Sequence, residues 1–333
     1  MGQLMMTRRN LAIAGAVIVM ITSVIFYAMD GQQTTAVLSG TVRAATLLVL
    51  GAMCGMIGER SGVVNIGIEG QFLMAAFLSF TVTSMTGSLA LGVFVGIGTG
   101  LALGWALAAM SVGLKIDQII AGTVINIAAV GVTSFFFDRG RSLGTAKYSS
   151  IKLGPLGDLP LVGTVLFNRP PLTYLTMILV VVVHIALFKS VWGLRTRAVG
   201  EHPGAVDTVG VDVIKLRYLN VTLAGGLAGL GGAYLALESV GTFSRGMSGG
   251  RGFLALAVMI FGRRTPFGAY AAALFFGFTT ALQSQFQLNN TFDIPPQFIG
   301  MLPFVVTILV VAFSGFFGSM RDPAALGQPY EKG

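Results

Sequence analysis

The sequence predicts an all-α integral membrane protein, a polytopic bundle of about ten transmembrane helices within a range of eight to ten. Of its 333 residues, 54% are hydrophobic and only 10% are charged, whereas a soluble domain usually carries about 25% charged residues. Long apolar runs recur along the chain, and most approach the ~20 residues that a helix needs to cross the hydrocarbon core. We therefore exclude a soluble fold and treat residues 1–333 as one transmembrane domain.

Ten apolar segments are the candidate spans. They cover residues 11–29, 40–58, 64–84, 88–112, 117–137, 172–189, 218–238, 252–262, 267–286 and 297–317. The first follows a basic start, as a signal peptide would, but no small-residue cleavage site stands out, so we interpret it as a retained helix. Segment 252–262 is too short to cross alone as a regular helix. It is either re-entrant or begins earlier, within the glycine-rich stretch 245–252.

The distribution of lysine and arginine predicts the orientation. If the N-terminus is cytoplasmic and all ten segments cross, thirteen of the 21 basic residues fall on the cytoplasmic face and eight on the outer face. The positive-inside rule then places both termini in the cytoplasm. The outer loop 138–171 is either a plain connector or a docking surface. The net charge of +8 is scattered between apolar runs, which argues against nucleic-acid binding.

Two further patterns concern the arrangement of the helices. Small residues recur at helical spacing at Gly92, Gly96, Gly100 and Gly104 and at Gly225 and Gly229. Such smooth faces let helix backbones approach closely inside lipid. Segments 40–137 and 218–317 each hold four spans and are separated by one helix and by segment 190–217. The first span of segment 40–137 would run from outside to inside, and the first span of segment 218–317 from inside to outside. Such opposite directions are those of an inverted repeat, a common transporter design.

A polar stretch, "ERSGVVNIGIEGQ" at residues 59–71, interrupts two apolar runs. A carboxylate within a membrane is costly unless it is paired or hydrated, so Glu69 needs a reason. One interpretation is a polar patch of Asn65, Glu69 and Gln71 that binds a polyol-like solute, with Asn65 and Glu69 four residues apart on one helix face. The other is an interfacial turn whose Glu69 faces cytoplasmic water. Both interpretations remain open at this point.

The longest polar segment on the predicted inner face is residues 193–218. Glu201 and His202 precede Pro203, which suits the first turn of a short helix. Ala205, Val206 and Val209 would then form one apolar face. The segment is either a solvated loop or a surface helix that docks a soluble partner.

Residues 236–268 hold two glycine-rich turns with Arg245 and Arg251, followed by the apolar segment that Phe253 begins. This region is either a loop with interfacial snorkelling or a gate or broken helix that lines the pathway. Asn126 lies within a span, where a lone Asn is more often a contact between helices than a ligand.

The sequence offers no catalytic constellation. It has no GxxxxGK[ST] phosphate loop, no HExxH motif, and no series of Asp, Glu or His along its spans. Cys54 is the single cysteine, which excludes disulfides within the chain and cysteine-based zinc sites. We therefore expect a non-catalytic chain without a cofactor of its own.

Three stretches resemble a known family. "RAATLLVLGAMCGMIGERSGVVNIGIEGQFLMAAF" resembles a signature of permease subunits from bacterial ABC importers of nucleosides and simple sugars, within the group that includes the ribose and branched-chain amino acid permeases. "GLRTRAVGEHPGAVDTVGV" is similar to the family's cytoplasmic coupling segment, with His202 where Asn is usual. "GFLALAVMIFGRRTPFGAYAAALFFG" resembles the block near its C-terminus. The similarity runs from about residue 40 to 317 and is greatest to the shorter of the two permeases in nucleoside systems.

The resemblance implies a machine with several subunits in the bacterial inner membrane. The chain would pair with a second permease, most simply as a heterodimer. ABC ATPase subunits, which carry ATP and magnesium, would dock at segment 190–217, and an extracytoplasmic binding protein would deliver the solute. The architecture would be type II importer-like, similar to the vitamin B12 permease. The implied coupling residues are Arg197, Gly200, Glu201, His202, Pro203 and Asp207.

In such folds the pathway lies at the dimer interface. The implied pathway residues are Asn65, Glu69, Gln71, Asn126 and Phe253. The transported solute would be a nucleoside or related riboside, with a simple sugar as the alternative. A self-sufficient secondary transporter or channel is a more distant alternative, because such a carrier does not require a segment that docks a motor.

Overall fold

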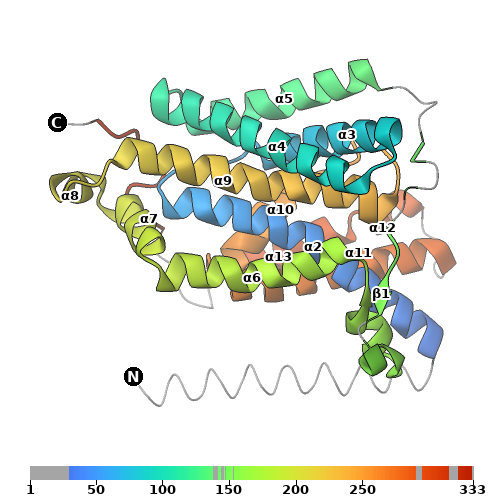
Figure 1. The fold of residues 1–333 in the computed structure, drawn as a ribbon. Helices are drawn as coiled ribbons and strands as arrows, with labels where there is room; N and C mark the ends of the chain where they lie inside the picture. The colour runs from blue at the N-terminus through green and yellow to red at the C-terminus, as the bar shows by residue number, and fades with distance from the viewer. Residues whose placement is uncertain are drawn as a thin grey trace, which may run out of the picture.

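The computed structural model describes residues 30–137, 142–143, 146, 148–152, 154–289, 295–314 and 322–331. Within them, long helices lie side by side along one direction (Figure 1). The α-helices are α2 (Gly31–Arg60), α3 (Ile68–Thr86), α4 (Leu89–Ala108), α5 (Gln118–Phe136), α6 (Pro171–Lys189), α7 (Val191–Glu201), α8 (Pro203–Thr208), α9 (Val213–Ala233), α10 (Arg251–Phe261), α11 (Pro266–Asn289), α12 (Pro296–Gly300) and α13 (Leu302–Ser314). The tighter or wider turns are η1 (Ala109–Gly113), η2 (Gly154–Asp158), η3 (Gly163–Phe167) and η4 (Tyr234–Val240).

The two ends of the bundle differ. At one end, here the α7 end, lie α7, α8 and the last described residues (Figure 1). At the other, here the hairpin end, two short strands pair antiparallel. They are β1 (Ile151–Lys152) and β2 (Asn168–Arg169), with Ile151 opposite Arg169. The predicted outer loop 138–171 therefore contains local structure where it is described.

Six helical segments in the described part of the chain are long and apolar enough to cross a membrane. They are Gly31–Arg60, Ile68–Thr86, Leu89–Gly113, Gln118–Phe136, Pro171–Lys189 and Val213–Val240. They coincide with six of the ten predicted spans, which confirms an all-α membrane protein. The predicted first span, 11–29, lies outside the described residues, and the total of about ten stays a prediction.

Helix α2 begins at Gly31, nine residues before the predicted start of the second span. The Asp30 side chain accepts the Gln33 N–H at 3.0 Å and so caps the helix. With this cap, the polar stretch 31–39 joins the helix and extends it to 30 residues, about 45 Å at 1.5 Å per residue. Arg43 is one of the eight basic residues that the predicted spans place on the outer face, but it lies well inside this long helix.

Two predicted spans near the C-terminus differ from continuous crossing helices. α10 has 11 residues, about 16 Å, which is half of a ~30 Å hydrocarbon core. Turns occupy residues 245–250 before it, so the segment does not begin earlier as a helix. Segment 297–317 is broken at Met301 between α12 and α13, and its last three residues lie outside the described ones.

The predicted glycine faces pack α4 against α9. A Cβ on Gly100 would lie 2.2 Å from the Gly225 oxygen and 2.5 Å from the Gly229 Cα. Those distances are far below van der Waals contact, so the two backbones approach closely because no side chain lies between them. The close approach expected from the spacing of the glycines is confirmed.

Candidate functional site

Glu69 lies in the first turn of α3 and caps a second helix, α10. Its Oε1 accepts the Gly250 N–H and its Oε2 accepts the Gly252 N–H, both at 2.7 Å. The first N–H groups of a helix lack partners within it and carry its positive dipole end, so a carboxylate is favourable there. A Cβ on Gly252 would lie 2.5 Å from the Glu69 nitrogen, so the contact requires glycine. Both oxygens of Glu69 are already bonded inside the protein.

The structure corrects the expected relation between Asn65 and Glu69. α3 begins at Ile68, so Asn65 lies in the preceding turn and shares no helix face with Glu69. Asn65 is buried, and its Nδ2 donates to Gln71 Oε1 at 3.2 Å and to Cys54 Sγ at 3.4 Å. Asn65 Oδ1 and Gln71 Nε2 have no hydrogen-bond partner within the described part of the chain. The amide pair is an interior network beside Cys54 and does not reach a water-exposed surface.

Asn126 and Phe253, the other predicted pathway residues, form no hydrogen bond with this pair in the described part of the chain, although Asn126 binds main-chain groups beside both of its members. Asn126 Oδ1 accepts the Gly70 N–H at 2.7 Å and its Nδ2 donates to the Ile66 oxygen at 3.1 Å. Asn126 thereby joins α5 to the start of α3, as the interhelical interpretation expects. Phe253 is about half exposed, on α10.

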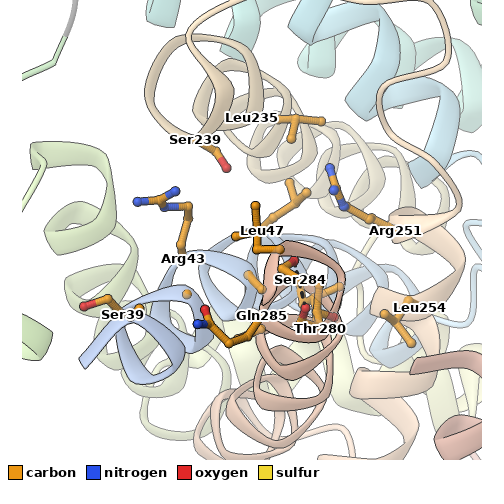
Figure 2. A pocket seen from close by; sticks show the side chains of 16 residues that line it. Ser39, Arg43, Leu47, Leu235, Ser239, Arg251, Leu254, Thr280, Ser284 and Gln285 are labelled. Carbon is orange, nitrogen blue, oxygen red and sulfur yellow. Dashed lines mark hydrogen bonds between the residues drawn. The ribbon is translucent and has the colours of Figure 1, made fainter. Parts of the chain in front are cut away.

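A cavity of about 420 Å³ lies between α2, η4, α10 and α11 (Figure 2). Small-molecule sites usually have volumes of roughly 300–1,000 Å³. Its wall mixes apolar side chains with polar ones, the latter being Ser39, Arg43, Ser239, Arg251, Thr280, Ser284 and Gln285. The five predicted pathway residues are not part of this wall. The residues that line the cavity were therefore not predicted as pathway residues.

Two arginines reach the cavity from different helices, Arg43 from α2 and Arg251 from α10 (Figure 2). Arg43 is the thirteenth residue of α2, about 18 Å along the helix from Gly31, and its side chain is exposed. Arg251 Nη1 donates to the Met247 oxygen at 3.2 Å. In the described part of the chain, neither arginine has an ion pair with Asp or Glu. A sequence signal for Arg43 existed, because it is the only charged residue in segment 40–58.

The predicted coupling segment forms α7 and α8 at the α7 end. The Ser190 hydroxyl accepts the Gly193 N–H at 3.0 Å and caps α7, and Pro203 opens α8 as expected. Buried Thr196 and Asn220 form a hydrogen bond, Asn220 Nδ2 to Thr196 Oγ1 at 3.1 Å, that fixes α7 against α9. The segment is therefore a pair of short helices anchored to the bundle.

The individual coupling residues differ in exposure. Glu201 and His202 are exposed, and Arg197, Pro203 and Asp207 are partly buried. Gly200 is buried, and a Cβ there would lie 2.3 Å from the Arg60 oxygen. The Arg197 guanidinium lies 5.2 Å from the Phe188 ring centroid.

The expected apolar face of α8 is wrong in two of its three residues. Val206 is buried, but Ala205 is exposed and Val209 is 76% exposed. The helix ends at Thr208 after six residues, so Val209 leaves the face that a longer helix would continue. The result is an apolar side chain that projects from the α7 end.

Residues 322–331, here the C-terminal strap, cross the α7 end. The Ala325 N–H donates to the Gly200 oxygen at 2.9 Å and the Gly327 N–H donates to the Gly62 oxygen at 3.0 Å. The Ala324 N–H reaches Glu201 Oε2 at 3.2 Å. The strap therefore joins the turn after α2 to the end of α7.

Charged side chains extend the contacts of the strap. Buried Arg217 of α9 donates to the Gln328 oxygen at 2.9 Å. Lys115 forms an ion pair with Glu331 at 2.5 Å, and this hydrogen bond together with the Lys115 charge lowers the pKa of the Glu331 carboxyl. Four separate segments of the α7 end are thus held by one short stretch of chain.

A buried ion pair lies under the strap. Arg264 Nε donates to Glu59 Oε2 at 2.5 Å, and each side chain is only 8% exposed. Arg264 Nη2 also reaches Asp322 Oδ1 at 2.8 Å, and Arg60 donates to the Arg264 oxygen at 3.0 Å. The end of α2, the turn after α10 and the strap meet at Arg264.

Comparisons with known proteins agree with this geometry. Residues 37–311 match the family described as branched-chain amino acid transport system / permease component. The guanosine ABC transporter permease protein NupQ of Bacillus subtilis is 37% identical over 91% of this chain and 98% of its own length. The nucleoside ABC transporter permease protein NupC of Lactococcus lactis is 35% identical over 86% of this chain and 94% of its own.

Further matches widen the range of named solutes. The putative glucose ABC transporter permease protein TsgC13 of Haloferax volcanii is 35% identical over 89% of this chain and 97% of its own. At 26% and 24% identity, over 71% and 82% of its length, the chain is also similar to the guanosine ABC transporter permease protein NupP of Bacillus subtilis and the nucleoside ABC transporter permease protein NupB of Lactococcus lactis. No solved structure matches.

Proposed function

The chain belongs to the family of permease components of branched-chain amino acid transport systems, and from that premise we propose that it moves nucleosides or related ribosides into the cytoplasm as part of an ATP-driven importer. Members of this family are non-catalytic subunits of ABC transporters. Hydrolysis of ATP, with its magnesium, then belongs to a separate subunit. The relatives named for guanosine and nucleosides, at 37% and 35% identity over most of the chain, support this substrate class.

One observation carries the ATP-driven mechanism: α7 and α8 form a short, anchored helical projection at one end of the bundle. Exposed Glu201, His202 and Val209 supply charged, polar and apolar groups to a docking partner. A carrier that works alone needs no such projection. An ATPase subunit that docks there would transmit its movement from α7 to α2, because buried Gly200 lies directly against the α2 backbone.

The C-terminal strap offers a route by which movement of the docked ATPase subunit could reach the rest of the bundle. It bonds to Gly200 and Glu201 on one side and to Arg264 on the other. Arg264 follows α10, whose first residue borders the cavity. Movement of α8 would therefore reach the cavity through the strap and α10, a helix short enough to move as a unit.

Several finer features follow from the same proposal. About ten helices, in two inverted repeats, would span a bacterial inner membrane with both termini in the cytoplasm. A heterodimer with a second permease is supported by the paired permeases named for one solute in one organism. A binding protein would deliver the solute at the hairpin end.

A simple sugar is the second candidate solute, because one relative is named for glucose. The polar wall of the cavity suits the hydroxyls of a sugar and of a ribose alike. Direct comparison of the two solute classes separates the candidates.

The test is a reconstituted transporter. The chain is purified with the permease, ATPase and binding protein encoded beside it, and ATP hydrolysis is measured with a panel of nucleosides and sugars. Stimulation by nucleosides supports the proposal, and stimulation by sugars alone replaces the substrate class. A folded chain that retains no ATPase subunit on purification overturns the ATP-driven mechanism.

A point variant tests the docking surface. Val209→Asp should lower retention of the ATPase subunit and solute-stimulated hydrolysis by at least tenfold, because it places an unpaired charge in an apolar contact. Leu159→Asp, at an exposed leucine of the hairpin end, is the matched control and should retain the ATPase subunit.

A further inference from the structure

Arg43 and Arg251 place two positive charges beside the cavity at membrane depth. Arg43 precedes Arg60 by 17 positions in α2, about 25 Å from the α7 end. Arg251 opens α10, whose 11 residues span about 16 Å toward the same end. Both lengths fall within a hydrocarbon core of about 30 Å. The two guanidinium groups therefore lie at depths where a charge is costly.

A charge at this depth persists where it meets an opposite charge or a water-filled cavity. The cavity wall contains no Asp or Glu among the described residues, and the carboxylate that acts on Arg251 is Glu69, which already binds the N–H groups of Gly250 and Gly252. The Arg43 side chain has no hydrogen bond or ion pair in this part of the chain, and Arg251 has one bond to a main-chain oxygen. Most of the ten N–H donors of the pair are therefore available to a solute.

Guanidinium chemistry restricts which solutes match. Arginine offers five N–H donors in a rigid planar fork and no acceptor. The fork pairs with two adjacent acceptors, such as the O6 and N7 atoms of guanine, whereas adenine presents an N6 donor beside N7. The hydroxyls of Ser39 and Ser239 and the Gln285 amide also lack a partner among the described residues. These smaller groups suit ribose hydroxyls, which both donate and accept.

Building on the proposed function, we infer that Arg43 and Arg251 read the base of the solute and favour 6-oxopurine nucleosides over adenosine. The pair donates to the carbonyl oxygen and the adjacent ring nitrogen, while the hydroxyl and amide groups of the wall bind the ribose. No covalent step is involved. The preference is a property of this subunit, added to whatever the binding protein selects.

Uptake ratios separate the two sources of selectivity. Guanosine, inosine and adenosine uptake is measured in proteoliposomes that hold the complete transporter, with the same binding protein throughout. Arg43→Gln should lower the guanosine-to-adenosine uptake ratio about tenfold relative to the unmodified chain, the usual scale for loss of one bidentate base contact. Arg43→Lys should lower it too, since lysine keeps the charge but loses the fork. Arg251→Gln should act in the same direction.

Arg245→Gln is the matched control, because exposed Arg245 lies outside the cavity wall, and its uptake ratio should not change. Equal loss of guanosine and adenosine uptake in Arg43→Gln, at equal amounts of folded protein, would overturn base reading. Uptake of guanosine monophosphate in preference to guanosine would also overturn it, since the pair would then be a phosphate site. An unmodified transporter that takes up sugars but no nucleoside would overturn the proposed function and this inference with it, whereas unchanged ratios in a working nucleoside transporter would overturn the inference alone.

Discussion

The arginines at the two regions of the molecule have opposite surroundings. At the α7 end, Arg264 is buried and binds Glu59 and Asp322, and buried Arg217 binds a strap carbonyl. At the cavity, Arg43 and Arg251 form no ion pair with a carboxylate in the described part of the chain, although the Glu69 charge acts on Arg251. Arg264 thus has most of its bonding capacity filled by carboxylates, whereas Arg43 and Arg251 keep most of theirs open. Buried Arg217 lies between these cases, because its Nε and Nη2 have no partner among the described residues.

The difference separates structural charges from functional ones. A buried guanidinium with carboxylate partners joins segments of the chain, and its removal leaves an uncompensated charge. A guanidinium at membrane depth without a partner costs stability unless water or a solute satisfies it. Pairing, more than residue type or position in the sequence, distinguishes the two roles here.

The largest expected effect comes from breaking the buried pair. Arg264→Met should lower the free energy of unfolding by about 3–5 kcal/mol, because Glu59 is left charged and buried without its partner. Thermal unfolding in detergent measures the loss. The double variant Glu59→Gln/Arg264→Met should recover part of it, since neither charge then remains.

The identical substitution at the cavity is the control. Arg43→Met should change the free energy of unfolding by no more than about 0.5 kcal/mol, as is usual for an exposed side chain without partners. Equal destabilisation by the two substitutions would contradict the comparison, because Arg43 would then be a structural residue.

An intermediate effect is expected at Glu69, a carboxylate that binds backbone N–H groups instead of arginine. Glu69→Gln should cost about 1.5–3 kcal/mol, because an amide has one acceptor oxygen and loses the charge-assisted bonds to the start of α10. Nucleoside uptake should fall in proportion to the amount of folded protein. A fall in uptake per folded molecule would instead assign Glu69 a direct contact with the solute.

Composition and periodicity predicted the parts of the fold that depend on apolar length and small-residue spacing. Six spans and the close backbone approach along the glycine faces needed nothing else, whereas the pairing of α4 with α9 came from the structure. The early start of α2 was missed because polar residues 31–39 carry no span signal, although Asp30 caps them. The short length of α10 was predicted correctly from its apolar segment. Its cap comes from Glu69, 182 positions before Arg251, and no local pattern encodes such a distant partner.

The candidate site was less predictable. Asn65, Gln71 and Asn126 stood out as polar residues in apolar runs, but the structure shows that they bond to other parts of the protein. Arg43 was counted as an outer-face topology signal because the predicted span began at residue 40, which put Arg43 near the end of a helix and not in its middle. The strap escaped notice because its main-chain bonds require no particular side chains.

Among the paired carboxylates, the smallest effect on stability is expected at Asp322, the exposed partner of Arg264. The Asp322 side chain is 64% exposed, so Asp322→Asn should cost no more than about 1 kcal/mol, and 1 M salt should remove most of the difference. Coupling should be more sensitive than stability, because Asp322 links the strap to the turn after α10. Nucleoside-stimulated ATP hydrolysis by the reconstituted transporter should fall several-fold while basal hydrolysis stays the same. Unchanged stimulation would remove the strap from the coupling route and leave α7 to act on the bundle directly through Gly200.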